Sequence, residues 1–427
     1  MTNVLRKIKI EPLFHISKRT DIARWKSWLV RGIAILSALL MCGIISSILV
    51  PGSFGQFFDE MFKGAFSTPR RVVNFFQEIA ILLCISLAVT PAFKMKFWNI
   101  GAEGQVLMGG LLCATMMKYL GGTVNNTVLI LIMLVVSVAG GAIWGVIPAI
   151  FKAKWNTNET LFTLMMNYIA MGLIAFTITI WVPGGSGVVG IIEHGHFPNL
   201  GRYPYILNII IVAILTVLMF IYLRFSKHGY ELTVVGESIN TAKYIGINVK
   251  KVIVRTMLLS GAICGIAGWL LVGGTSHTIS TSTAGGRGFT AILISWLAHF
   301  DPLTMTFTSF LVAFMDKGAT QAASAFNFGG SFPNIITAVF FFFVIASEFF
   351  VNYRIKFNGS LFKKKSPKYS IDSEYVREDG KSDEQFIDSN EIESLTAEDT
   401  ECSAVNGTAV NDTAADDPTD TDGEVSE

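Results

Sequence analysis

Residues 128–151 have the sequence VLILIMLVVSVAGGAIWGVIPAIF, which contains no charged side chain. A helix of about 20 mainly apolar residues is long enough to cross the roughly 30 Å hydrocarbon core of a bilayer. Only 15% of the 427 residues are charged, whereas soluble domains have about a quarter. Similar apolar stretches recur at 32–50, 79–93, 161–182, 206–223, 257–272 and 335–351. We therefore predict an all-α, polytopic integral membrane protein.

The lysine and arginine clusters between these stretches predict the topology, because basic residues are retained on the cytoplasmic side of a membrane. Such clusters precede the first stretch and lie at 94–96, 152–154, 224–255 and 354–368. If all of them are cytoplasmic, about ten transmembrane helices are required, and both termini lie inside. That count includes three short segments, at 105–119, 289–300 and 303–315.

The charges of the two ends of the chain are opposite in sign. From Asp372 onward there are 19 acidic residues and two basic ones, Arg377 and Lys381. This segment has too few apolar residues to form a packed core. We predict a basic cytoplasmic N-terminus (1–31), a transmembrane domain (32–357) and an acidic, disordered cytoplasmic tail (358–427).

An unusual polar string opens the first short segment. It consists of Phe97-Trp98-Asn99-Ile100-Gly101-Ala102-Glu103-Gly104-Gln105, called here the 97–105 motif. Each polar group in a membrane costs a few kcal/mol unless it faces protein or water. Non-helical backbone at membrane depth is tolerated where it is buried in protein or lines a cavity, as in transporter binding sites.

The motif and a later helix supply candidate substrate-binding residues. Aromatic faces and amide or carboxylate groups are the usual means of holding a polar ring compound. The candidates are Phe97, Trp98, Asn99, Glu103, Gln105 and Asn167. For Glu103 the alternative is structural, because a carboxylate near a helix N-terminus accepts hydrogen bonds from free backbone N–H groups.

Two pairs of glycine-rich segments suggest related halves. The short segments at 105–119 and 289–300 are both introduced by glycines, and Gly141–Gly145 and Gly261–Gly265 have the same small-xxx-small spacing. Broken segments at matching places in two halves are typical of a midplane substrate site. Because glycines four residues apart are common in membrane helices, an internal repeat and a coincidence both remain open.

The hydrophilic connection at 224–252 contains a predicted short helix at 238–245. Ser238 is a suitable N-cap, and Gly246 stands where helices tend to end. Such a helix is either an ordinary surface helix or the attachment point of a soluble motor subunit.

Four strings make the chain recognisable: the 97–105 motif, Asn158-Glu159-Thr160 with residues 164–168, residues 229–249, and residues 288–292. Together they resemble the permease subunits of bacterial ATP-binding-cassette importers, in the branch that handles ribose, branched-chain amino acids and nucleosides. The 97–105 motif is most similar to the purine nucleoside permeases. The resemblance covers roughly residues 30–355.

The resemblance implies a multi-pass protein of the bacterial plasma membrane that works as a homo- or heterodimeric permease. It also implies separate ATPase subunits and an extracellular substrate-binding lipoprotein. Residues 229–249 match the loop that docks on the ATPase, so the expected coupling residues are Gly229, Gly236, Glu237, Ala242, Tyr244 and Gly246. Lipid surrounds such a protein, and no nucleic-acid partner is expected.

The chain lacks signals for enzyme chemistry. No Gly-x-x-x-x-Gly-Lys-[Ser/Thr] phosphate loop occurs. The Gly-x-Gly-x-x-Gly pattern at 185–190 follows a membrane segment rather than a strand. The histidines and cysteines have no ligand-like spacing. We expect no catalytic residue, cofactor or metal.

The predicted function is nucleoside import by alternating access, driven by separate ATPases. Two alternatives remain. One is a permease for ribose or simple sugars, or for branched-chain amino acids, in the same importer class. The other is a secondary transporter driven by an ion gradient, in which Glu103 or Glu78 would be the proton or sodium site.

Overall fold

The computed structural model describes residues 14–18, 24–184, 189–199, 201 and 203–357. The predicted acidic tail at 358–427 and residues 185–188 of the glycine-rich pattern lie outside the described residues.

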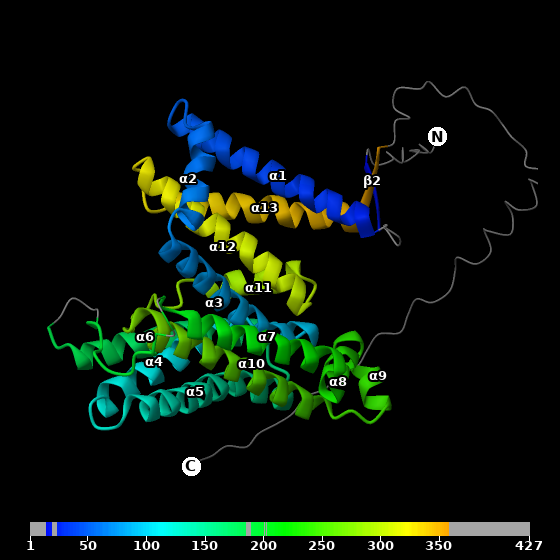
Figure 1. Ribbon diagram of the computed structural model, residues 1–427. Helices are drawn as coiled ribbons and strands as arrows, with labels where there is room; N and C mark the ends of the chain where they lie inside the picture. The colour runs from blue at the N-terminus through cyan, green and yellow to red at the C-terminus, as the bar shows by residue number, and fades with distance from the viewer. Residues whose placement is uncertain (1–13, 19–23, 185–188, 200, 202, 358–427) are drawn as a thin grey trace, which may run out of the picture. The chain divides into compact units, whose positions relative to one another are not determined.

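The described chain is built from helices (Figure 1). Their bounds are α1 (Arg24–Leu49), α2 (Phe54–Phe66), α3 (Pro69–Lys94), α4 (Ala102–Leu120), α5 (Asn126–Trp155), α6 (Glu159–Trp181), α7 (Ile206–Phe225), α8 (Lys227–Glu237), α9 (Ile239–Tyr244), α10 (Val249–Leu271), the π-helix η1 (Val272–Ser276), α11 (Arg287–Leu297), α12 (Pro302–Ala325) and α13 (Phe332–Asn352). The described strands β1 (Phe14–Lys18) and β2 (Tyr353–Phe357) form an antiparallel pair, with Phe14 opposite Phe357.

Within the described residues, seven helices are long and apolar enough to cross a membrane: α1, α3, α5, α6, α7, α10 with η1, and α13. The prediction of an all-α, polytopic membrane protein is therefore confirmed. Each of the ten apolar segments used for the topology coincides largely with a helix, although the segment at 289–300 runs past the end of α11 at Leu297. Helices α4, α11 and α12 are too polar or too short for that group of seven. The number of crossings and the cytoplasmic placement of both termini stay predictions.

Helices α3 and α10 are central. In the most apolar window of each, 72% and 78% of the residues are buried, against 22–33% in the other five spans. A span with most of its circumference buried packs mainly against protein rather than lipid. The elements around α3 and α10 therefore define the interior of the membrane domain.

Glycine allows α4, α5 and α10 to approach closely. A Cβ atom on Gly141 of α5 would lie 2.7 Å from the backbone nitrogen of Gly265 of α10, and one on Gly109 of α4 would lie 2.7 Å from Gly265 Cα. A Cβ on Gly145 would lie 3.2 Å from Gly261 Cα. The two small-xxx-small strings noted in the sequence therefore pack against each other, as small residues do at membrane helix interfaces.

The hydrophilic connection folds into α8 and α9. The predicted short helix is confirmed as α9, because Ser238 Oγ accepts a hydrogen bond from Thr241 N at 3.2 Å and Gly246 has a φ of +81° just beyond its end. Helix α8 precedes it and was not predicted. Ser226 caps α8 by accepting a hydrogen bond from Gly229 N at 3.0 Å.

Candidate functional site

The 97–105 motif connects α3 to α4 inside the bundle. Phe97 is 3% exposed and Asn99 is fully buried. Lys96 has a φ of +59°, which reverses the chain after α3, and α4 begins at Ala102. The non-helical backbone predicted here is present between α3 and α4, with Phe97 and Asn99 buried and Trp98 exposed.

Asn99 organises the polar interior of the motif. Its Oδ1 accepts hydrogen bonds from Gly101 N at 3.0 Å and from Gln105 Nε2 at 3.3 Å. Its Nδ2 donates to Ser260 Oγ on α10 at 3.3 Å. Gln105 is 1% exposed, and its Oε1 has no hydrogen-bond partner among the described residues.

Asn167 joins α6 to the same turn. Its Nδ2 donates to the Ile100 carbonyl at 2.9 Å, and its Oδ1 accepts from Gly104 N at 2.8 Å. A Cβ on residue 104 would lie 2.8 Å from that oxygen, so glycine is required there. One amide side chain therefore satisfies two backbone groups that the broken helix leaves free.

Glu103 contacts a different short helix. Its Oε1 accepts from Gly286 N and its Oε2 from Gly288 N, both at 2.7 Å, and the residue is 6% exposed. These N–H groups belong to the start of α11, where the helix dipole favours a negative charge. The structure thus joins the two glycine-introduced segments directly, through one carboxylate.

The predicted candidates do not all meet. Asn99, Glu103, Gln105 and Asn167 are all buried near the start of α4, whereas Trp98 lies at the surface. Trp98 is 45% exposed and packs on Trp296 of α11, with ring centroids 5.3 Å apart. Substrate contact by any of these residues stays a prediction.

A partly buried charge cluster joins Glu78, the alternative ion site predicted from the sequence, to two basic residues that were not predicted as its partners. Arg287 Nε and Nη2 donate to the two oxygens of Glu78 at 2.6 and 3.2 Å, and Lys317 Nζ lies 3.3 Å from Glu78 Oε2. The Glu78 side chain is 13% exposed. The sequence signal that could have revealed this cluster is that each of its three charged residues lies beside an apolar segment. Charged residues at such positions are costly in a membrane and are usually functional.

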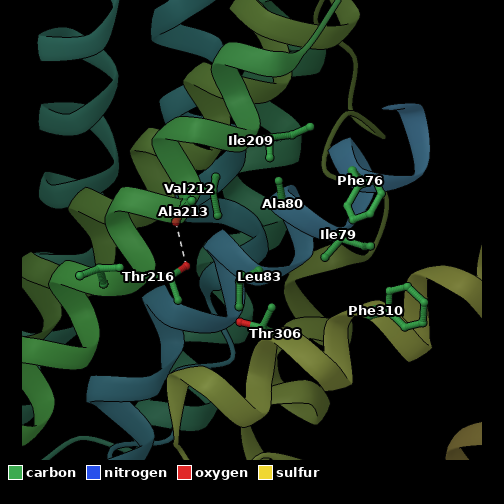
Figure 2. Close-up of a pocket in the computed structure, with 11 residues that line it drawn as sticks. Phe76, Ile79, Ala80, Leu83, Ile209, Val212, Ala213, Thr216, Thr306 and Phe310 are labelled. Atoms are coloured by element: carbon green, nitrogen blue, oxygen red, sulfur yellow. Dashed lines mark hydrogen bonds between the residues drawn. The ribbon is translucent and has the colours of Figure 1, made fainter. Parts of the chain in front are cut away.

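A cavity of about 330 Å³ lies between α3, α7 and α12 (Figure 2). Its walls are apolar except for two threonines, and two phenylalanine rings face it. The lining residues are Phe76, Ile79, Ala80, Leu83, Ile209, Val212, Ala213, Thr216, Val217, Thr306 and Phe310. Thr216 Oγ1 donates to the Val212 carbonyl at 2.8 Å, shown by the dashed line in Figure 2.

The sequence of the domain that carries these features matches a known protein family. The family model of the branched-chain amino acid transport system / permease component matches residues 71–347. The chain belongs to this permease family. The permease is a transport subunit and a multi-pass protein of the cell membrane, from a class that associates with ATPase and substrate-binding components.

Several relatives are similar over most of their length. The permease is 28% identical over 358 residues to the guanosine ABC transporter permease protein NupP of Bacillus subtilis, covering 81% of this chain and 99% of that one. It is 26% identical to the glucose ABC transporter permease protein TsgB13 of Haloferax volcanii, covering 77% and 90%. It is 24% identical to the nucleoside ABC transporter permease protein NupB of Lactococcus lactis, covering 67% and 82%.

The expected coupling residues of the permease divide into two groups. Gly229, Gly236 and Ala242 are buried, whereas Glu237, Tyr244 and Gly246 are exposed. Tyr244 is 90% exposed.

Gly236 of the permease packs against the end of α3. A Cβ there would collide with the Lys94 carbonyl oxygen and lie 3.4 Å from Met95 Cα. Helix α8 therefore contacts the backbone immediately before the 97–105 motif.

Proposed function

We propose that the permease imports nucleosides by alternating access, with ATP hydrolysed on separate subunits. The observation that carries this proposal is the alignment with a guanosine permease over 99% of that protein's length. A second relative is a nucleoside permease, but a third is a glucose permease of comparable similarity. The choice between nucleoside and sugar therefore depends on the chemistry of the cavity.

The cavity suits an aromatic ring better than a hexose. The Phe76 and Phe310 rings offer flat apolar faces, and only Thr216 and Thr306 offer hydroxyls. A buried hydroxyl without a partner costs about 1–3 kcal/mol. A hexose, which carries hydroxyls around its whole ring, is therefore matched less well than a nucleoside, whose hydroxyls are confined to the ribose and whose base is flat. The volume of about 330 Å³ lies within the range of small-molecule sites, about 300–1,000 Å³.

The contacts of α8 support a route for conformational coupling. Helices α8 and α9 offer an exposed surface to an ATPase, and Gly236 contacts the end of α3. Residues 95–101 lead from there into α4, whose Glu103 binds the start of α11. We propose that a shift of α8 moves α3, α4 and α11 together.

Uptake assays test the proposal. Cells that express the permease with its ATPase should accumulate labelled guanosine, and unlabelled nucleosides should compete while glucose, ribose and leucine do not. Competition by glucose or leucine instead of nucleosides would favour the corresponding alternative. Uptake that survives ATP depletion but collapses with an uncoupler would favour the ion-gradient alternative.

A further inference from the structure

The polar side chains that line the cavity are two threonines on different helices. Thr216 lies on α7 and Thr306 on α12, and the other lining side chains are aliphatic or aromatic. Ligand sites with mostly apolar walls use a small number of polar groups to fix the orientation of what they bind. These two hydroxyls are therefore the side-chain groups of the cavity that can recognise a polar part of a substrate.

Helix α12 runs antiparallel to α3 beside the cavity. The Phe310 ring packs on Phe75 near the start of α3, with ring centroids 5.3 Å apart. Closer to the start of α12, Met305 Sδ lies 3.5 Å from Thr90 Oγ1, near the end of α3. Phe310 is therefore at the end of the cavity nearest the start of α3, and Thr306 is one turn further from it.

Phenylalanine rings and hydroxyls consequently lie at opposite ends of the cavity. Phe76 and Phe310 are at the end nearest the start of α3, whereas Figure 2 shows Thr216 and Thr306 close to Leu83, away from Phe76. About two helical turns, roughly 10 Å, separate Phe76 from Leu83 along α3. A ligand that joins a flat ring to a hydroxylated ring matches this division.

Each threonine hydroxyl offers the cavity an acceptor rather than a donor. Thr216 Oγ1 donates its hydrogen to the Val212 carbonyl at 2.8 Å, and Thr306 Oγ1 donates to the Pro302 carbonyl at 3.1 Å. A threonine hydroxyl has one hydrogen and two lone pairs, so each oxygen can still accept. Two such acceptors select a ligand that presents O–H or N–H groups to this end of the cavity.

We propose that Thr216 and Thr306 accept hydrogen bonds from the 2′- and 3′-hydroxyls of a ribonucleoside whose base lies against Phe76 and Phe310. This inference rests on the proposed nucleoside import and assigns the residues that recognise the sugar. Ribose presents its two hydroxyls side by side, which suits two acceptors on α7 and α12, helices that are in contact. A 2′,3′-dideoxynucleoside has the same base and lacks both donors.

The preference for ribose in threonine variants tests the proposal. The quantity measured is the kcat/KM for guanosine uptake divided by that for 2′,3′-dideoxyguanosine, with the same ATPase and substrate-binding component throughout, so that their own preference cancels between variants. In Thr216→Val with Thr306→Val this ratio should be about 10-fold lower than in the wild type, because two hydrogen bonds to guanosine are lost. Uptake of 2′,3′-dideoxyguanosine should be unchanged, and it therefore reports that the double variant is folded.

Substitutions of the same type provide the controls. Thr177 Oγ1 on α6 also donates to a carbonyl of its own helix, that of Leu173 at 2.8 Å, but Thr177 is exposed and does not line the cavity. Thr177→Val should therefore keep the wild-type ratio. Thr216→Ser with Thr306→Ser retains both oxygens and should restore guanosine uptake. If the double valine variant does not fold, each single valine variant should still lower the ratio by about 3-fold.

Phe310→Leu separates recognition of the base from recognition of the sugar. It should lower uptake of guanosine and of 2′,3′-dideoxyguanosine alike, because both carry the base, and it should leave their ratio unchanged. Wild-type guanosine uptake, or a wild-type ratio, in the folded valine variants would overturn the proposal. Loss of uptake in the serine double variant equal to that in the valine double variant would also overturn it. Failure of the wild-type importer to take up any nucleoside would instead overturn the proposed function itself.

Discussion

Glu103 connects two segments that are far apart in the sequence. Its two oxygens accept hydrogen bonds from two backbone N–H groups of α11, at 2.7 Å each. A carboxylate suits this task because both of its oxygens accept and its charge complements the helix N-terminus. The contact places the first turn of α11 against the first turn of α4, with Gly288 close enough that a Cβ would lie 2.6 Å from Glu103 N.

Glu103→Gln should destabilise the permease, because an amide has only one accepting oxygen and leaves Gly286 N or Gly288 N unpaired. The expected loss is about 1–3 kcal/mol, measured as thermal unfolding in detergent. Glu103→Ala should lose more, and should strongly reduce uptake while ATPase assembly persists. Glu159→Gln is the matched control, since Glu159 also begins a helix but pairs only with Lys152 among the described residues. Unchanged stability and uptake in both Glu103 variants would show that the contact is dispensable.

At the level of single residues, the sequence predicted the unusual positions better than their partners. The insertion cost of a polar string identifies 97–105, and three of its polar residues are buried near the start of α4 together with Asn167 of α6. The partners Gly286 and Gly288 could not be predicted, because backbone N–H groups carry no sequence signal. Arg287 and Lys317 were missed since each looks like an ordinary charge until the fold brings it to Glu78.

Helices α5 and α10 depend on glycine for their close approach. Gly141→Ala places a Cβ 2.7 Å from Gly265 N and 2.8 Å from Gly265 Cα, and backbone cannot move aside as a side chain can. We expect a loss of about 1–3 kcal/mol, as for other overpacked interiors, measured by thermal unfolding and by the yield of folded protein. Gly172→Ala in α6 is the control, because a Cβ there meets no atom within 4 Å. Equal stability of the two variants would contradict close glycine packing.

Long helices follow from apolar length, so α1, α3, α5, α6, α7, α10 and α13 were predictable from the sequence. Three further helices were not. Helix α2 buries only one face, which carries Phe57, Met61 and Ala65. Its sequence therefore contains no long apolar run. Helix α8 lies in a polar connection, and η1 contains Gly273 and Gly274, both closely packed against other side chains that the sequence does not identify.

An ion pair connects α8 to the first turns of α10. Arg255 Nη2 donates to Glu231 Oε2 at 2.7 Å, and this hydrogen bond lowers the pKa of the Glu231 carboxyl. A lowered pKa in the folded state stabilises the protein above the unfolded value of about 4.3. That contribution disappears as the pH falls through the folded pKa.

The pH dependence of Glu231→Gln checks this sign. Near pH 7 the variant should unfold at a slightly lower temperature than the wild type, because a partly exposed ion pair contributes about 0.2–1 kcal/mol. The difference should shrink below about pH 4.3. Glu237→Gln, on an exposed residue without an ion pair among the described residues, should show no such trend. A difference that grows as the pH falls would contradict the assignment.

Across the whole molecule, one continuous set of contacts joins the exposed coupling surface to the interior. Tyr244 and Ile245 are 90% and 54% exposed at the end of α9, whereas Gly236 in α8 touches the backbone of Lys94 and Met95. We therefore expect docking and transmission to depend on different residues and to fail separately.

Tyr244→Ala should weaken docking of the ATPase without destabilising the permease, because exposed tyrosines often contribute strongly to interfaces. We expect co-purification of the ATPase to fall about 10-fold, equivalent to about 1.4 kcal/mol, together with uptake. Tyr119→Ala is the control. Tyr119 is also exposed, at 60%, but it lies at the opposite end of α4 from the 97–105 motif. Normal co-purification and uptake in Tyr244→Ala would show that α9 does not dock the ATPase.

Gly236→Ala should give the opposite pattern. Its Cβ would collide with the Lys94 carbonyl oxygen, which pushes α8 away from α3 while the outer surface of α9 stays intact. The ATPase should still co-purify and hydrolyse ATP, but uptake should fall because movement of α8 no longer reaches the 97–105 motif. Gly55→Ala in α2 controls for a change of glycine to alanine in a helix, since a Cβ there meets no atom within 4 Å. Loss of ATPase binding in Gly236→Ala would mean that α8 forms part of the docking surface itself. Unchanged uptake in this variant would mean that coupling does not pass through the end of α3.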